Sequence, residues 1–178
     1  TTSNITGLTT DQMVALNATQ VGALTTAQVA KLSTEQVVAI EKADLAKATT
    51  SQILSLTTEQ VNALLTDQVA ALGVTQVAAM GTDDVQALST EQIVALSGTQ
   101  LAALTTRQFR LLGDSQLAAI ETGDIASLTV SQLQAITTSN ITGLTTDQMV
   151  ALNATQVGAL TTAQVAKLST EQVVAIEK

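Results

Sequence analysis

Residues 56–64 read Leu-Thr-Thr-Glu-Gln-Val-Asn-Ala-Leu, and this stretch contains the signals from which the fold is predicted. Thr57 stands three residues before Gln60, which is the spacing of a capping box. In that motif the hydroxyl accepts from the Gln60 N–H, and the Gln60 side chain accepts from the Thr57 N–H. Leu56 and Val61 occupy the two positions of a hydrophobic staple. The stretch therefore predicts a helix that begins after Thr57 and ends before the next cap.

The same eight-residue pattern, called the octad below, continues without a shift along all 178 residues. The cap residue is position 1, so Gln60 is at position 4, Val61 at position 5 and Leu64 at position 8. Position 8 is Leu in 16 of 22 octads, position 4 is Gln in 17, and position 5 is Val, Ile, Leu, Met or Phe in all 22. We interpret residues 1–178 as a single repeat array.

A longer repeat is superimposed on the octad. Residues 1–42 recur without a change as residues 137–178, so the array has a 136-residue higher-order unit of seventeen octads. A weaker recurrence at 40 residues places Asp44, Asp84 and Asp124 where other octads have Gln. The unchanged copy indicates recent duplication, homogenisation or design.

Each octad predicts a helix of about six residues, which is too short to be stable alone in water. Such a helix must bury its apolar face against neighbouring octads, as the units of a solenoid do. We therefore predict an all-α solenoid or superhelix of very short helices, one per octad, with positions 5 and 8 inside. A β-solenoid with two octads per coil is the alternative, because Thr and Val favour strands. A single continuous helix is disfavoured, since its apolar stripe would drift around the whole circumference.

Composition argues against catalysis and against several classes of partner. The chain has no His and no Cys, so the usual general bases, thiol nucleophiles and zinc ligands are missing. We predict no enzyme activity, no catalytic residues, no metal site and no cofactor. The net charge of −8 disfavours binding to phosphate backbones, so no nucleic-acid partner is expected. No apolar run is long enough for a transmembrane helix, so no membrane insertion is expected.

The candidate site with the sharpest chemistry is a set of Thr residues at position 2, which is Thr in 15 of 23 cases. Regular Thr on a flat face would suit binding of an ordered ligand such as ice. The competing interpretation is that Thr beside the cap simply helps to start a helix. The Thr-face candidates are Thr10, Thr26, Thr34, Thr50, Thr58, Thr66, Thr82 and Thr90.

Two other motifs depart from the repeat. Asp83 and Asp84 form an adjacent acidic pair, which we interpret as favourable charge at a helix start. Asp44, Asp84 and Asp124 would share one ridge if five octads completed a whole number of superhelical turns. Residues 107–112, Arg-Gln-Phe-Arg-Leu-Leu, place two Arg around the only Phe, which predicts either a contact site or local repacking.

The tract Leu-Thr-Thr-x-Gln-Val-x-Ala-Leu, as at 56–64, resembles octapeptide repeats of large bacterial adhesin-like or filamentous-haemagglutinin-like surface proteins. The resemblance implies an extracellular or cell-surface location and a role as rod, spacer or adhesive stalk. The first residues carry no signal peptide, so targeting information is expected elsewhere in a longer protein. Both ends cut the array without a polar capping repeat, which predicts end-to-end self-association.

Overall fold

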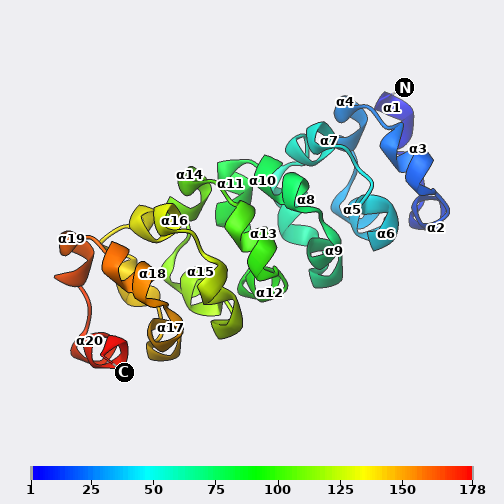
Figure 1. The fold of residues 1–178 in the computed structure, drawn as a ribbon. Coiled ribbons are helices and arrows are strands. Elements are labelled where there is room, and N and C mark those ends of the chain that lie inside the picture. The colour runs from blue at the N-terminus through cyan, green and yellow to red at the C-terminus, as the bar shows by residue number, and fades with distance from the viewer. Residues whose placement is uncertain (1, 178) are drawn as a thin grey trace. The chain divides into compact units, whose positions relative to one another are not determined.

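The computed structural model describes residues 2–177, and these residues fold into short helices with no strand among them. The prediction of an all-α solenoid with very short helices is confirmed, and the β-solenoid alternative is wrong (Figure 1). Two octads adopt the tighter 3-10 form instead of the α form. The chain is divided into two compact units, residues 1–88 and 89–178.

The helices of the first unit follow one another at octad intervals. They are α1 (Thr2–Ile5), α2 (Thr10–Val14), α3 (Ala18–Gly22), α4 (Thr26–Val29), α5 (Thr34–Ala39), α6 (Lys42–Leu45), α7 (Thr50–Leu54), α8 (Thr58–Ala63), α9 (Thr66–Ala71), α10 (Val74–Ala79) and α11 (Thr82–Ala87).

The second unit continues the pattern with two 3-10 helices, η1 and η2, among its α-helices. Its elements are α12 (Thr90–Val94), α13 (Gly98–Ala103), α14 (Thr106–Arg110), α15 (Asp114–Ala119), η1 (Thr122–Ser127), α16 (Val130–Ala135), η2 (Ile141–Gly143), α17 (Thr146–Ala151), α18 (Ala154–Ala159), α19 (Thr162–Val165) and α20 (Thr170–Ile176).

The octad determines where each helix begins and ends. At the start of α8, the Gln60 N–H donates to Thr57 Oγ1 at 3.3 Å, and the Thr57 N–H donates to Gln60 Oε1 at 2.7 Å. At its end, Leu64 leaves the helical region with φ −54° and ψ 138°, and its N–H donates to the Val61 carbonyl at 3.2 Å. Because the next helix begins two residues later, the chain turns sharply without any Pro.

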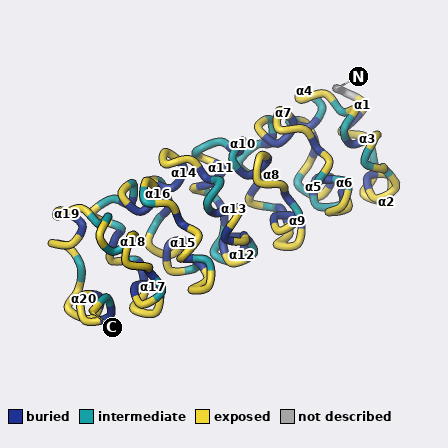
Figure 2. The backbone as a smooth tube through the Cα atoms, in the orientation of Figure 1, coloured by how far each residue is buried: buried dark blue, intermediate teal, exposed yellow. Residues whose placement is uncertain are grey.

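The core is built from positions 5 and 8 of the octad. Val61 is 0% exposed and Leu64 is 4% exposed, and their counterparts are buried along most of each unit. Figure 2 shows buried and exposed segments alternating along the chain, with each octad contributing to both. The apolar side chains are therefore divided among many short helices rather than gathered on a few long ones.

Helices three octads apart pack against each other, so that each unit contains three rows of helices. In the first unit the rows are α1, α4, α7 and α10; α2, α5, α8 and α11; and α3, α6 and α9. In the second unit the rows include α12, α15 and η2; α13, η1, α17 and α20; and α14, α16 and α18. One turn of the superhelix thus takes about three helices, which the octad pattern alone does not specify.

The Gln at position 4 joins successive turns. Gln36 is 4% exposed, and its Nε2 donates to the carbonyl oxygens of Ile5 at 2.9 Å and Leu8 at 2.7 Å. The same pair of bonds, across 31 and 28 residues, recurs for Gln52, Gln60, Gln68, Gln76, Gln132, Gln148, Gln156, Gln164 and Gln172. Each of these side chains caps its own helix through Oε1 and pairs with the preceding turn through Nε2. We call this series the glutamine ladder.

At Gly143, close packing between turns leaves no room for a side chain. A Cβ on Gly143 would lie 2.7 Å from Asp114 Cα and 3.0 Å from the Asp114 carbonyl oxygen. Because backbone cannot move aside as a flexible side chain can, we expect Gly143→Ala to lower the free energy of unfolding by about 1–3 kcal/mol. Urea unfolding followed by circular dichroism measures this loss.

The matched control for this prediction is Gly7→Ala. Gly7 has the same surrounding sequence as Gly143, but a Cβ there would meet only its own Asn4 carbonyl oxygen, at 3.5 Å. We expect Gly7→Ala to be neutral or stabilising by up to about 1 kcal/mol. Equal losses from both substitutions would contradict a packing effect specific to Gly143.

Candidate functional site

The eight Thr residues predicted as a face share a structural position but belong to different rows. Each one is the first residue of a helix. Thr10, Thr34, Thr58 and Thr82 begin the four helices of a single row, α2, α5, α8 and α11. The remaining four begin α4, α7, α9 and α12: Thr26, Thr50, Thr66 and Thr90. The structure therefore gathers four of the predicted residues in one row and places Thr26 and Thr50 on neighbouring helices of another, so the eight do not form a single face.

The Thr hydroxyls are not uniformly available to a ligand. Thr10, Thr26, Thr50 and Thr66 are exposed, whereas the other four are half-buried. The Thr58 hydroxyl donates to Asp84 Oδ1 at 2.9 Å, across the contact between α8 and α11. At least one member of the set thus has an internal structural partner. Whether the exposed members bind a ligand stays a prediction.

The acidic pair singled out in the sequence has two different environments. Asp83 is exposed, but Asp84 is only 6% exposed and also accepts from the Gly81 N–H at 3.0 Å. Asp84 therefore replaces Gln at the start of α11 and binds Thr58 instead of backbone carbonyls. Asp44 lies in α6, in a different row of the same unit, because five octads are not a multiple of the three that separate packed helices.

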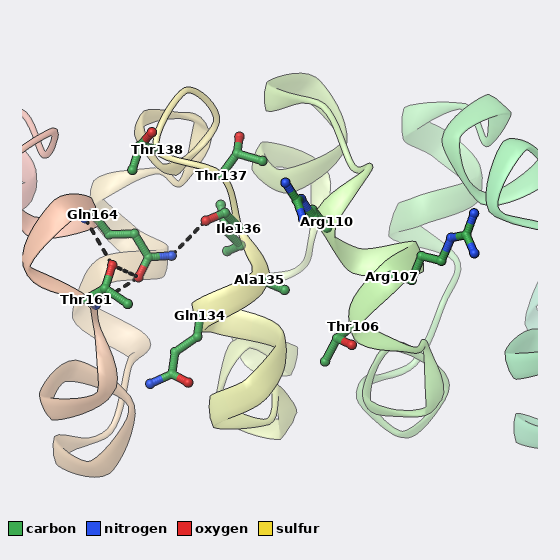
Figure 3. Close-up of a pocket in the computed structure, with 10 residues that line it drawn as sticks. All are labelled: Thr106, Arg107, Arg110, Gln134, Ala135, Ile136, Thr137, Thr138, Thr161 and Gln164. Carbon is green, nitrogen blue, oxygen red and sulfur yellow. Dashed lines mark hydrogen bonds between the residues drawn. The ribbon is translucent and has the colours of Figure 1, made fainter.

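The two Arg residues lie on α14 beside an open hollow of about 570 Å³ in the second unit (Figure 3). Both are exposed, and neither is paired with a carboxylate within the described part of the chain. Figure 3 shows Arg110 extending toward Thr137, while Arg107 points away from α16. The remaining lining residues are uncharged: Thr106, Gln134, Ala135, Ile136, Thr137, Thr138, Thr161 and Gln164.

The amide side chains in this hollow are already engaged. Gln134 Nε2 donates to the Ala159 carbonyl at 3.0 Å, and Gln164 Nε2 donates to the Ile136 carbonyl at 2.8 Å. The Arg110 guanidinium, which extends toward Thr137, is therefore the charged donor over the hollow, and Arg107 adds a second exposed guanidinium on the same helix that points away from α16 (Figure 3). We call Arg107 and Arg110 the arginine surface.

A second charged surface lies in the first unit and was not recognised from the sequence. In the row of α2, α5, α8 and α11, every helix has an exposed acidic residue at position 3 of its octad. These residues are Asp11, Glu35, Glu59 and Asp83, and together they are called the acidic ridge. Their regular spacing of 24 residues is visible in the sequence, but its meaning depends on knowing that helices three octads apart are neighbours.

Four Glu side chains in first helical turns are stabilised as carboxylates. The pKa values of Glu35, Glu59, Glu91 and Glu171 lie below the usual range, first because each carboxylate accepts from its own backbone N–H and then because it accepts from the cap hydroxyl. A carboxyl group whose pKa is depressed by folding stabilises the fold above its unfolded pKa, and that contribution disappears as the pH falls through the folded pKa.

We therefore expect the melting temperature to fall as the pH is lowered from about 5 to about 3 at physiological ionic strength. Repulsion along the acidic ridge opposes this trend only weakly, because salt screens exposed charges beyond about 8 Å. Thermal melts followed by circular dichroism measure the effect. A variant with all four Glu replaced by Gln should lose less stability over the same pH range, and an equal loss would contradict the assignment.

Across residues 2–177, no three acidic side chains gather closely enough to hold a metal ion. Over the same residues, every helix is too short to cross a bilayer.

Comparison with known protein families gives a match over most of the chain. The model of the ALTTAQ repeat matches residues 37–74, 77–114, 117–154 and 150–177, which together cover most of the chain. The first three matches begin 40 residues apart, at the same interval as Asp44, Asp84 and Asp124. No curated protein matches the sequence.

Proposed function

Because the chain belongs to the ALTTAQ repeat family, we propose that it is a non-catalytic structural repeat segment that acts as a rod or spacer in a bacterial surface or adhesion protein. A spacer needs a unit that can be repeated without limit and that stacks on itself. The octad meets this requirement, because a short helix buries its apolar face only against its neighbours.

The glutamine ladder is the observation that carries this proposal. Each buried Gln links its own helix to the turn before it, so successive turns are joined by backbone-directed bonds that do not depend on the identity of neighbouring side chains. Gln132, for example, is 1% exposed and binds the Leu101 and Leu104 carbonyls, both at 2.8 Å. Any octad with Gln at position 4 can therefore add to the stack.

Small-angle X-ray scattering tests the spacer role on chains with one and two copies of the 136-residue unit. For a spacer, doubling the number of octads should come close to doubling the radius of gyration. A compact globule of twice the length would grow by only about 30%. Growth near the globular value would overturn the proposal.

The surface location rests on the resemblance to bacterial adhesin-like repeats and needs its own test. Antibody against the array should label intact cells that produce the full-length protein, and external protease should remove the label. A cytoplasmic marker serves as the control, since it should be reached only after lysis. Labelling that requires lysis would overturn the surface location and leave the spacer role intact.

Ice binding is the alternative function, favoured by the alignment of Thr10, Thr34, Thr58 and Thr82 in one row. Thermal hysteresis measures it directly. If Thr10 and Thr34 contact ice, replacing both residues by Val or by a larger residue should remove the hysteresis. The same replacements at Thr26 and Thr50 are the control and should leave the hysteresis unchanged. If the unmodified chain shows no hysteresis, ice binding is ruled out and the spacer role is the remaining proposal.

A further inference from the structure

The arginine surface has no internal partner, in contrast to a similar hollow in the first unit. There, Lys42 of α6 lies 3.3 Å from Asp67 of α9, beside a hollow of about 440 Å³. Asp67 stands at position 3 of its octad, so this pair joins a cation to an acidic residue at the start of a packed helix. Neither Arg107 nor Arg110 forms such an ion pair within residues 2–177, and no acidic residue lines the hollow beside them, so their charge is left for an external carboxylate.

The same chain displays carboxylates of this kind in a row. Neighbouring helices pack at about 8–10 Å, so the acidic ridge presents Asp11, Glu35, Glu59 and Asp83 at intervals of that order. All four are exposed, and position 3 places each in the first turn of its helix. The chain as a whole is acidic, with a net charge of −8, so two guanidinium groups on one helix form a local positive exception.

We propose that the arginine surface of one chain binds the acidic ridge of a second copy, so that the arrays associate side by side. The contact repeats in trans the Lys42–Asp67 type of pairing, with guanidinium in place of ammonium. Arg suits this role because its planar fork can donate two hydrogen bonds to one carboxylate. The inference goes beyond the spacer role, since a spacer can function as a single chain.

Sedimentation velocity over a range of protein concentrations tests the proposal. At low ionic strength, where the Debye length is about 30 Å, the sedimentation coefficient should rise with concentration, and at 0.3 M salt or more the rise should largely vanish. The double variant Arg107→Gln/Arg110→Gln should weaken association about tenfold or more. Its control is Lys31→Gln/Lys47→Gln, which changes the net charge equally at two exposed cations elsewhere and should leave association unchanged.

The acidic side of the contact has a matched pair of variants. Glu35→Gln/Glu59→Gln removes two ridge carboxylates and should abolish association. Glu91→Gln/Glu171→Gln removes two carboxylates with the same local capping bonds outside the ridge and should preserve it. Circular dichroism shows whether each variant is still folded.

Mixing gives the decisive result. The arginine variant keeps an intact ridge, and the Glu35/Glu59 variant keeps intact arginines, so the two should associate with each other although neither associates with itself. Association that persists in the arginine variant or at high salt would instead indicate contact through the ends of the array and would overturn the proposal. A strictly monomeric chain at low salt would overturn it as well.

Discussion

Replacing Gln148 by Glu is expected to lower the free energy of unfolding by about 3–5 kcal/mol, one of the largest single-residue effects in the second unit. Gln148 is 1% exposed, and its Nε2 donates to the carbonyls of Leu117 at 2.8 Å and Ile120 at 2.6 Å. A carboxylate cannot donate to either oxygen. It would place an unpaired negative charge beside two buried carbonyl oxygens that no longer have a hydrogen-bond donor. The buried charge and the unsatisfied carbonyls each lower the free energy of unfolding.

The chain contains a matched control for this substitution at Gln12. Residues 9–16 and 145–152 have the same sequence, and both Gln side chains accept from their cap N–H, at 2.9 Å for Thr9 and 2.8 Å for Thr145. Gln12, however, is exposed and has no ladder bond to other described residues. Glu also fits a capping box, so Gln12→Glu should change stability by less than about 0.5 kcal/mol.

Guanidinium chloride unfolding, followed by circular dichroism, compares the two variants on one scale. The expected result is a lowered midpoint for Gln148→Glu and an unchanged midpoint for Gln12→Glu. If both substitutions are tolerated, the ladder contributes little and the turns are held by apolar contacts alone. If both are damaging, the capping bond rather than the bond between turns is the important one.

The start and end of each helix are predictable from the octad, but the contacts between successive turns are not. The glutamine ladder shows this difference. The Thr57–Gln60 pair signals a helix start because both groups lie within one helical turn. That Gln60 also reaches Val29 and Leu32 depends on which earlier octad lies beside it. Near-identical octads do not encode the number of helices per turn, so this partner cannot be read from local pattern.

One sequence signal of the ladder is nevertheless present. A capping box accepts Glu as readily as Gln, yet position 4 is Gln in 17 of 22 octads and never Glu. For the buried Gln residues, the partner that the amide NH₂ finds on the preceding turn explains this choice. The remaining octads have Asn or Asp; Asn140, for example, donates through Nδ2 to the Leu112 carbonyl at 2.9 Å, across the same 28 residues.

The candidate surfaces show the same limit. The Thr residues form a regular stripe in the sequence, but Thr10 and Thr34 share a row whereas Thr26 belongs to another. Conversely, the 24-residue spacing of Asp11, Glu35 and Glu59 has no evident meaning in the sequence until the three-octad packing places their helices side by side. Neither grouping can be read from the octad alone, because the assignment of octads to rows depends on contacts about one superhelical turn apart.

Replacing Phe109 by Ala is the second substitution with a large expected effect, a loss of about 3–5 kcal/mol in the free energy of unfolding. Phe109 is 1% exposed at position 5 of its octad, where Leu101 and Leu117 stand in the octads on either side. Removing the ring deletes most of the buried apolar surface of α14 and leaves a void. A helix of five residues has few other contacts with which to compensate.

The control is Phe109→Leu, because Leu fills position 5 in both adjacent octads. We expect this variant to lose only about 1 kcal/mol, since a smaller void can be closed by small shifts of a short helix. Urea unfolding measures both losses. Since Arg107 and Arg110 are carried by the same helix, the Leu variant should retain self-association at low salt, whereas the Ala variant should weaken it in proportion to the unfolding of α14. Equal stability of the two variants would mean that the ring fills no specific space, and α14 would then be held by its capping box and its neighbours in the row alone.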